Sequence, residues 1–268
     1  MKFALQIHGQ LRTFQKTLPT LLNFIDYYNK DVDVFLFINK GSTENFSYSA
    51  GSYMLGSANY SEENMNHLIS LLKLDRIKII KYINEMTDEE KQIEKTKLDE
   101  YQILWRKFED KHGGISKHDI GPALMYRRYL LNNMRLDYEK NNNIKYDYVI
   151  QTRFDFGTTY TEKYDINEST TPVMLSESLS IGKPEFINKE SECILEWPIT
   201  PKVLYDDNCN LLKEKYEKYK NWRGEKFIEK HWIFMPELNI RLFLLENNIN
   251  FIEAWWKEPC NYGFKLIR

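Results

Sequence analysis

The chain has 268 residues, 42% of them hydrophobic and 28% charged, a composition typical of a soluble globular protein. A formal net charge of −2 provides no overall positive field, so we expect no nucleic-acid partner. No apolar stretch is long enough to span a bilayer, and three widely spaced cysteines indicate neither a zinc site nor a disulfide framework, so we expect a cytoplasmic protein without a transmembrane segment.

The first half of the chain alternates apolar runs with amphipathic stretches. We predict strands at residues 3–7, 32–38, 77–83 and from 146, and helices at about 18–28, around 65–72, at 88–111 and from Pro122. Residues 41–60 are rich in Gly, Ser, Tyr and Asn, which predicts a long loop. The long helix is expected to turn a set of apolar side chains inward, namely Ile93, Tyr101, Leu104, Trp105 and Phe108.

After Asp155 the pattern changes to shorter apolar pieces. They lie at residues 173–175, 179–181 and 193–195, and are followed by a mixed-charge helix through Tyr216, a last helix at about 237–246 and a short strand near Phe251. Strands separated by helical stretches predict an α/β fold with a mainly parallel sheet flanked by helices. Since no linker or internal repeat interrupts the chain, we expect one continuous domain, 1–268.

Two of the predicted strands are followed by residues suited to binding a ligand. In open α/β sheets ligands bind beyond the carboxyl ends of the strands. After the first strand come Gly9, which lets a ligand approach the backbone, and Arg12, a forked donor suited to phosphate. After the strand from 146 come Arg153 and Asp155, which are two residues apart and so point the same way in extended backbone. If both strands belong to one sheet, these residues form one wall of a nucleotide-diphosphate pocket.

Simpler interpretations of these residues stay open. Arg153 and Asp155 also fit two solvated charges at a strand end, and His8 either lines the pocket or merely ends its strand. A kinase or dehydrogenase is disfavoured, because the chain contains neither a Gly-x-Gly-x-x-Gly motif nor a Gly-Lys-Ser/Thr phosphate loop.

Five short segments are informative when taken together. They read Ile-His-Gly-Gln-Leu-Arg-Thr-Phe, Tyr-Arg-Arg-Tyr-Leu-Leu-Asn-Asn, Tyr-Asp-Tyr-Val-Ile-Gln-Thr-Arg-Phe-Asp, Leu-Ser-Ile-Gly-Lys-Pro-Glu-Phe-Ile and Met-Pro-Glu-Leu-Asn-Ile-Arg-Leu-Phe-Leu. The chain thereby resembles nucleotide-sugar glycosyltransferases of the GT-A type, such as those of bacterial surface-polysaccharide clusters and large DNA viruses. The resemblance covers most of the chain. It implies a Rossmann-like nucleotide-binding half, 1–157, and an acceptor-side half, 158–268.

The resemblance also implies a metal, with one departure from the family pattern. GT-A enzymes commonly carry Asp-x-Asp, whose last carboxylate binds the metal that bridges the phosphates of the sugar nucleotide. Here Arg153 stands at the first position, and Asp155 would be the contact for Mn²⁺ or Mg²⁺. Alternatively, Arg153 neutralises the diphosphate directly and the enzyme is metal-independent. By the same resemblance His8, Gly9, Arg12 and Arg153 would contact the nucleotide.

Transfer with inversion needs a base for the acceptor hydroxyl, and the candidates are Glu237, Glu229 and His231. Glu237 is preferred, although an acidic residue in a first helical turn also simply suits the helix dipole. His231 would be a third metal contact, or else an ordinary packed or exposed histidine. Trp255 and Trp256 either stack on sugar rings or pack in the core, and being adjacent they face opposite sides of a strand.

The sequence therefore predicts a glycosyltransferase that moves a sugar from a nucleotide-diphosphate sugar to a glycan or other hydroxyl acceptor, with Asp155 at the metal and Glu237 as the base. Two alternatives stay open: a sugar nucleotidyltransferase, and a catalytically inactive binder of nucleotide sugars or glycans. The donor sugar, the nucleotide base, the acceptor, the stereochemical course and the oligomeric state are not indicated by the sequence.

Overall fold

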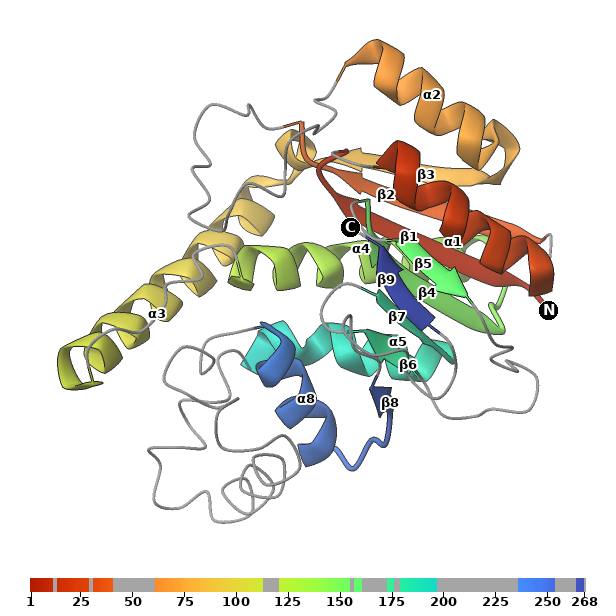
Figure 1. Cartoon of the computed structure of the whole chain (residues 1–268). Coiled ribbons are helices and arrows are strands. Elements are labelled where there is room, and N and C mark those ends of the chain that lie inside the picture. The colour runs from red at the N-terminus through yellow and green to blue at the C-terminus, as the bar shows by residue number, and fades with distance from the viewer. Residues whose placement is uncertain are drawn as a thin grey trace. The chain divides into compact units, whose positions relative to one another are not determined.

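The computed structural model describes residues 1–11, 14–28, 31–40, 61–112, 121–154, 157–160, 173–175, 179–196, 236–253 and 264–267 (Figure 1). Side chains are described within these ranges except at 24, 27–28, 107–112, 157–160, 173–175, 236–238, 252–253 and 264–267. The chain divides into two compact units. The sheet unit comprises Met1–Met86, Leu130–Ile187 and Phe251–Arg268, and the helical unit comprises Thr87–Tyr129 and Asn188–Asn250.

The sheet unit contains all the described strands, together with helices α1 and α2. Its elements are β1 (Phe3–Gly9), α1 (Phe14–Tyr28), β2 (Val32–Ile38), α2 (Glu62–Leu72), β3 (Ile77–Tyr82), β4 (Tyr148–Arg153), β5 (Gly157–Tyr160), β6 (Val173–Leu175), β7 (Leu179–Gly182), β8 (Ile252–Glu253) and β9 (Phe264–Ile267), with 3-10 turns at Leu74–Arg76 and Ile83–Glu85. The helical unit contains α3 (Asp88–His112), a 3-10 helix at Glu192–Glu196, and α8 (Pro236–Glu246). Helices α4 (Gly121–Asn142) and α5 (Pro184–Ser191) contribute residues to both units.

Seven strands form the main sheet in the order β3-β2-β1-β4-β7-β6-β8 (Figure 1). Strands β3, β2, β1 and β4 run parallel to one another, β7 is antiparallel to both β4 and β6, and β6 is parallel to β8. Strands β5 and β9 pair separately as an antiparallel ribbon. The predicted α/β fold with a mainly parallel sheet flanked by helices is confirmed.

One face of the sheet carries the main apolar core. Every second residue of the central strands is buried there together with the inner faces of α1 and α2, and the set includes Phe3, Leu5, Ile7, Val34, Leu36, Tyr148, Ile150, Leu18, Leu21, Ile25, Leu68 and Leu72. This alternation is what places the neighbouring residues of each strand on the opposite face. Strand β2 is buried along its whole length, as its nearly all-apolar sequence predicts.

Most predicted elements coincide with observed ones, and the main differences have physical reasons. Helix α1 begins at Phe14 and not near Leu18, because Phe14 is fully buried and its N–H closes a turn on the carbonyl oxygen of Leu11 at 2.9 Å. The last predicted helix and the short strand beyond it are confirmed as α8 and β8. Residues 193–195 lie in a 3-10 helix. The long loop at 41–60 and the helix through Tyr216 lie outside the described residues.

The prediction that Ile93 faces inward is wrong. In the helical unit Tyr101 of α3 is fully buried, but Ile93 is 37% exposed. Eight residues advance a helix about 80° beyond two full turns, so Ile93 and Tyr101 lie on different faces. The neighbouring Glu94 is turned inward instead, and it accepts a 2.8 Å hydrogen bond from Nε of Arg127 on α4. Phe108 is outside the described side chains.

The sequence predicts one domain whose two halves, 1–157 and 158–268, are each continuous in the chain. The two units are drawn by contacts in space, and each collects segments distant in sequence. The single glycosyltransferase domain therefore stays a prediction. Among the helices that the structure describes, none has the length and apolar character needed to cross a membrane.

Candidate functional site

The candidate site lies at the carboxyl ends of β1 and β4, where the strand order of the sheet reverses. From β1 the chain passes to β2 and β3 on one side, and then returns to β4 on the other side of β1. The chain that leaves the carboxyl end of β1 therefore continues to one side of the sheet, toward β2, and the chain that leaves β4 continues to the other side, toward β7. Open α/β sheets bind their ligands at such a point. The condition set by the sequence analysis, that both strands belong to one sheet, is confirmed, and the strands are immediate neighbours.

His8 and Arg153 form the last pair of opposed residues between β1 and β4. Residues directly opposite each other on parallel strands project to the same face of the sheet. The pair two residues earlier, which lies on the same face, shows this directly, because Nε2 of Gln151 donates to Oε1 of Gln6 at 3.0 Å. His8 is buried with 1% exposure, whereas Arg153 is partly exposed. The sheet edge thus presents a fixed cation that solvent reaches, beside a buried imidazole.

Gly9 ends β1 with a backbone angle φ of +109°, in the region that favours glycine. Its carbonyl oxygen accepts a 2.9 Å hydrogen bond from the N–H of Asn39, at the end of β2. Among the described residues, no atom lies within 4 Å of the position that a Cβ would take on Gly9. As far as the described residues are concerned, the backbone at Gly9 has open space beside it, as the predicted approach of a ligand requires.

Phe154, which follows Arg153 directly, is anchored by three kinds of contact. Its N–H donates to the carbonyl oxygen of His8 at 3.3 Å, and its side chain is 2% exposed in the apolar core. Its carbonyl oxygen accepts a 2.7 Å hydrogen bond from Oγ1 of Thr17 on α1. The chain that leads into Asp155 is therefore tied to β1, to the core and to α1.

The face of the sheet that carries His8 and Arg153 is polar underneath the candidate site. Gln6 and Gln151 are fully buried, and Nε2 of Gln6 donates to Oδ1 of Asn132 on α4 at 3.4 Å. The same oxygen accepts from Arg135 at 3.0 Å, and Arg135 also pairs with Glu139 one helical turn further along. Burial lowers the pKa of the Arg135 guanidinium, while Glu139 acts against this change. These groups form a buried hydrogen-bonded chain that fixes the register of β1 against β4.

A further positive charge lies at the carboxyl end of β2, the neighbour of β1. Lys40 follows β2, and its ammonium nitrogen lies 3.8 Å from the centre of the ring of Tyr82, the last residue of β3. Lys40 is exposed. Together with Arg153 it places two cations on the edge of the sheet that carries Gly9, which suits an anionic ligand.

The structure describes only part of the predicted set. His8, Gly9 and Arg153 are brought together as expected, whereas Arg12, Asp155, His231, Glu229, Trp255 and Trp256 lie outside the described residues. Glu237 is the second residue of α8, as predicted, but its side chain is outside the description. Among the described residues no group of three or more His, Cys, Asp and Glu side chains is arranged to hold a metal ion. The predicted ligands Asp155 and His231 are not among the residues to which that statement applies.

Sequence reasoning missed Gln6, Gln151, Thr17 and Lys40. A usable signal was present for the two glutamines, because each lies two residues before a predicted site residue in an otherwise apolar strand. With a period of two, Gln6 and His8 share one face, as do Gln151 and Arg153. Thr17 carried no such signal, since its partner is 137 residues away.

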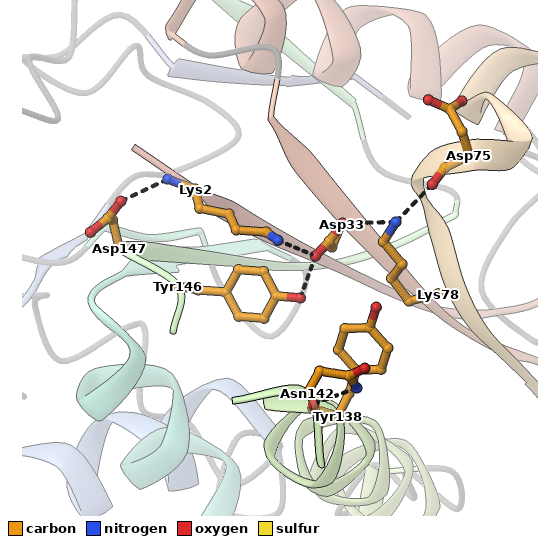
Figure 2. Close-up of polar contacts among 8 residues, drawn as sticks. All are labelled: Lys2, Asp33, Asp75, Lys78, Tyr138, Asn142, Tyr146 and Asp147. Atoms are coloured by element: carbon orange, nitrogen blue, oxygen red, sulfur yellow. Dashed lines mark hydrogen bonds and ion pairs between the residues drawn. The ribbon is translucent and has the colours of Figure 1, made fainter. Parts of the chain in front are cut away.

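The opposite edge of the sheet carries a second polar cluster, centred on Asp33 at the amino end of β2 (Figure 2). Asp33 is 5% exposed and lies 3.0 Å from Nζ of Lys2 and 3.2 Å from Nζ of Lys78. It also accepts a 2.7 Å hydrogen bond from the hydroxyl of Tyr146. Burial alone would raise the pKa of Asp33, but the hydrogen bonds from Tyr146 and the two lysines outweigh it, and the pKa is lowered.

This cluster is a structural connection between strand ends. Its members come from the amino ends of β1, β2, β3 and β4, far from the carboxyl ends where ligands bind. The pKa of Lys2 is raised by its hydrogen bond to Asp33, against the effect of burial, and that of Tyr146 is raised by burial and by the same carboxylate. These shifts favour the charged forms of Asp33 and Lys2 and the neutral form of Tyr146.

Comparison of the chain with models of known protein families gives no match. Comparison with curated protein sequences likewise finds no match. What is shown is therefore the α/β fold and the arrangement of the described residues.

Proposed function

We propose that the protein is a glycosyltransferase that binds a nucleotide-diphosphate sugar at the carboxyl ends of β1 and β4 and transfers the sugar to a hydroxyl acceptor. The observation that carries the proposal is the pairing of His8 with Arg153 next to Gly9 at the point where the strand order reverses. It supports a phosphate site because a forked, permanently charged donor stands beside the backbone of Gly9, where no atom of the described residues fills the space that a side chain would take. The resemblance of the five sequence segments to GT-A enzymes supplies the reaction class.

The chemistry requires that the negative charge developing on the leaving diphosphate is neutralised. Arg153 provides a charge-assisted hydrogen bond to the phosphates, and Lys40 adds charge at the same edge. Arg12 is proposed as a second phosphate contact from the segment after Gly9. The carboxylate of Asp155 is proposed to hold Mn²⁺ or Mg²⁺, with His231 as a further ligand. Glu237 is proposed to take the proton from the acceptor hydroxyl.

A thermal-shift screen tests the proposal on the whole chain. UDP-, GDP-, TDP- and CMP-sugars are each added with and without Mn²⁺ to wild type, Asp155→Ala and Glu237→Gln. A donor present at about 100 times its Kd should stabilise the wild type by roughly 2.7 kcal/mol. We expect one nucleotide class to give this shift in the presence of Mn²⁺. The stabilisation that requires Mn²⁺ should disappear in Asp155→Ala. Glu237→Gln should keep the shift and lose turnover, measured as release of the nucleotide, which is a nucleoside diphosphate from UDP-, GDP- and TDP-sugars and CMP from CMP-sugars.

Each other outcome changes the proposal or overturns it. A shift that is the same without Mn²⁺ and in Asp155→Ala moves the whole phosphate role to arginine and removes the metal from the proposal. Donor binding without release of nucleotide under any condition indicates a nucleotide-sugar or glycan binder. Turnover of a nucleoside triphosphate with a sugar phosphate indicates a nucleotidyltransferase. No response to any donor at saturating concentration overturns the proposed function.

A further inference from the structure

Thr17, in the first turns of α1, makes the contact from which the inference starts. Its side chain is fully buried, and its hydroxyl donates to the carbonyl oxygen of Phe154 at 2.7 Å. Phe154 directly follows the last residue of β4 and directly precedes Asp155. Its carbonyl group lies beyond the end of β4, where the regular hydrogen bonds between strands stop. A buried carbonyl oxygen nevertheless needs a hydrogen-bond donor.

The two backbone groups of Phe154 are thus bonded to two different elements. The N–H donates to the carbonyl oxygen of His8 on β1, and the C=O accepts from Thr17 on α1. The phenyl ring is buried in the core that α1 helps to form. With both groups held, the peptide unit on either side of Phe154 has little freedom to rotate, and this fixes the direction in which the chain leaves β4.

Helix α1 acts on the segment after β1 as well. The N–H of its first residue, Phe14, donates to the carbonyl oxygen of Leu11, two residues after Gly9, at 2.9 Å. The helix therefore connects the two strand ends that carry Gly9 and Arg153. Thr17 lies one turn further along the same helix, and its hydroxyl makes a polar contact between α1 and the end of β4.

We infer that Thr17 is a positioning residue, which holds the end of β4 in the place that ligand binding at Arg153 requires; this inference rests on the proposed function. The hydroxyl does not need to touch the ligand. It acts through the backbone of Phe154, and displacements of about 1 Å in a site of this kind are worth as much as 100-fold in rate. The effect is specific to the hydroxyl and not to the presence of a β-branched side chain.

Three variants of α1 separate positioning from general packing. Thr17→Val keeps the shape of the side chain and removes the donor, and Thr17→Ser keeps the donor. Thr20→Val is the matched control, because the hydroxyl of Thr20 donates to the carbonyl oxygen of Thr17 at 2.6 Å within the same helix and not to Phe154. If Thr17→Val does not fold, Thr17→Ala takes its place.

Binding is measured by calorimetry with UDP, GDP and TDP as probes, each in the presence of Mn²⁺. We expect Thr17→Val to weaken the binding of the active diphosphate by about tenfold or more, and Thr17→Ser and Thr20→Val to stay within about threefold of wild type. Wild-type affinity in Thr17→Val overturns the inference. Equal losses in Thr17→Val and Thr17→Ser overturn it too, because the hydroxyl is then irrelevant. Equal losses of affinity in Thr17→Val and Thr20→Val also overturn the inference, because they would show a general effect on α1.

Amide hydrogen exchange at Phe154 separates failure of this inference from failure of the proposed function. If wild type binds none of the three diphosphates, the proposed function fails. The role of the contact between Thr17 and Phe154 is then decided by the rate of amide hydrogen exchange at Phe154. Faster exchange at Phe154 in Thr17→Val, with wild-type exchange in Thr20→Val, supports the role of Thr17 in holding the end of β4. Unchanged exchange in Thr17→Val overturns it.

Discussion

Arg153 and Gly9 illustrate how single residues decide what this sheet edge is able to bind. Under the proposed function, Arg153 would stand at the first position of the Asp-x-Asp pattern, where a guanidinium attracts phosphate and a carboxylate would repel it. Gly9 supplies a backbone angle that other residues rarely adopt. The sequence alone indicated that Arg153 and Gly9 are candidate site residues. What the sequence did not show is that His8 lies directly opposite Arg153, because that follows from the register of two strands separated by about half the chain.

Replacement of Gly9 by alanine tests the backbone argument. A Cβ at this position meets no atom of the described residues within 4 Å, so the cost comes from the φ angle of +109°. We expect Gly9→Ala to lower the free energy of unfolding by about 1–2 kcal/mol. Urea denaturation measures this loss. An unchanged free energy of unfolding would mean that the chain adopts another backbone angle at Gly9 without cost.

At the scale of the elements, two polar clusters join strands of the same sheet at its two opposite edges. Beneath the candidate site, Gln6 and Gln151 bond across β1 and β4, and Asn132 of α4 joins them. At the other edge, Asp33 on β2 bonds residues from three other segments. Buried polar groups of this kind stabilise only when their partners are present, because an unsatisfied partner loses its bond to water as well.

A double-mutant cycle on Gln6 and Gln151 tests whether the pair holds β1 against β4. Each single change to leucine leaves a buried amide without its partner, so we expect each to cost about 1–3 kcal/mol of unfolding free energy. The double variant should cost less than the sum by about 1 kcal/mol, since both partners are removed together. Gln15→Leu is the control, because its 3.3 Å bond to Asn64 is exposed and its loss should cost within about 0.5 kcal/mol. Strict additivity would show that the two glutamines do not interact energetically.

The Asp33 cluster predicts a defined pH dependence of stability. The pKa of Asp33 is lowered in the folded protein, so its contribution is fully present above the pKa of an unperturbed aspartate, about 3.9, and is lost as pH falls through the lower folded value. We expect Asp33→Asn to cost about 1–3 kcal/mol at pH 7. The difference between wild type and Asp33→Asn should stay constant down to about pH 5 and shrink at lower pH.

Asp26→Asn is the matched control for that experiment. Asp26 also pairs with a cation, Arg76, at 3.2 Å, but its side chain is 42% exposed. An exposed ion pair contributes about 0–1 kcal/mol, so this variant should change stability little at any pH. Urea denaturation of the three proteins between pH 3 and pH 7 compares them. Equal effects of the two substitutions would contradict the role assigned to Asp33.

At the scale of the whole molecule, the period of the apolar residues predicted the sheet well. Strand β2 has the predicted bounds, and the helices with clear apolar faces occur where expected. The sequence failed where the decisive contact is distant in the chain. Thr17 meets Phe154, and the ion pair of Glu94 with Arg127 occupies a helix face on which an apolar residue was expected. Neither contact has a local pattern, because each depends on how the chain folds back on itself.

The candidate site divides in the same way between what was predicted and what was not. Strand patterns and the rule for open α/β sheets predicted that Gly9 and Arg153 meet at one edge, and the structure brings them there. The buried supports of that edge were not predicted, because Gln6, Gln151 and Thr17 read as ordinary polar residues until their partners are known. The roles of Arg12, Asp155, His231 and Glu237 stay predictions.

The most direct test of the central claim is a calorimetric titration of the donor class identified by thermal shift against wild type, Arg153→Gln and Arg76→Gln. Arg76 is the control, because it precedes β3 at the amino edge of the sheet and pairs with Asp26. Loss of a charge-assisted hydrogen bond to phosphate costs about 1.5–3 kcal/mol, so Arg153→Gln should weaken binding by roughly 10- to 100-fold. Arg76→Gln should bind as wild type does. Wild-type affinity in Arg153→Gln, or an equal loss in Arg76→Gln, would contradict the placement of the phosphates at the carboxyl ends of β1 and β4.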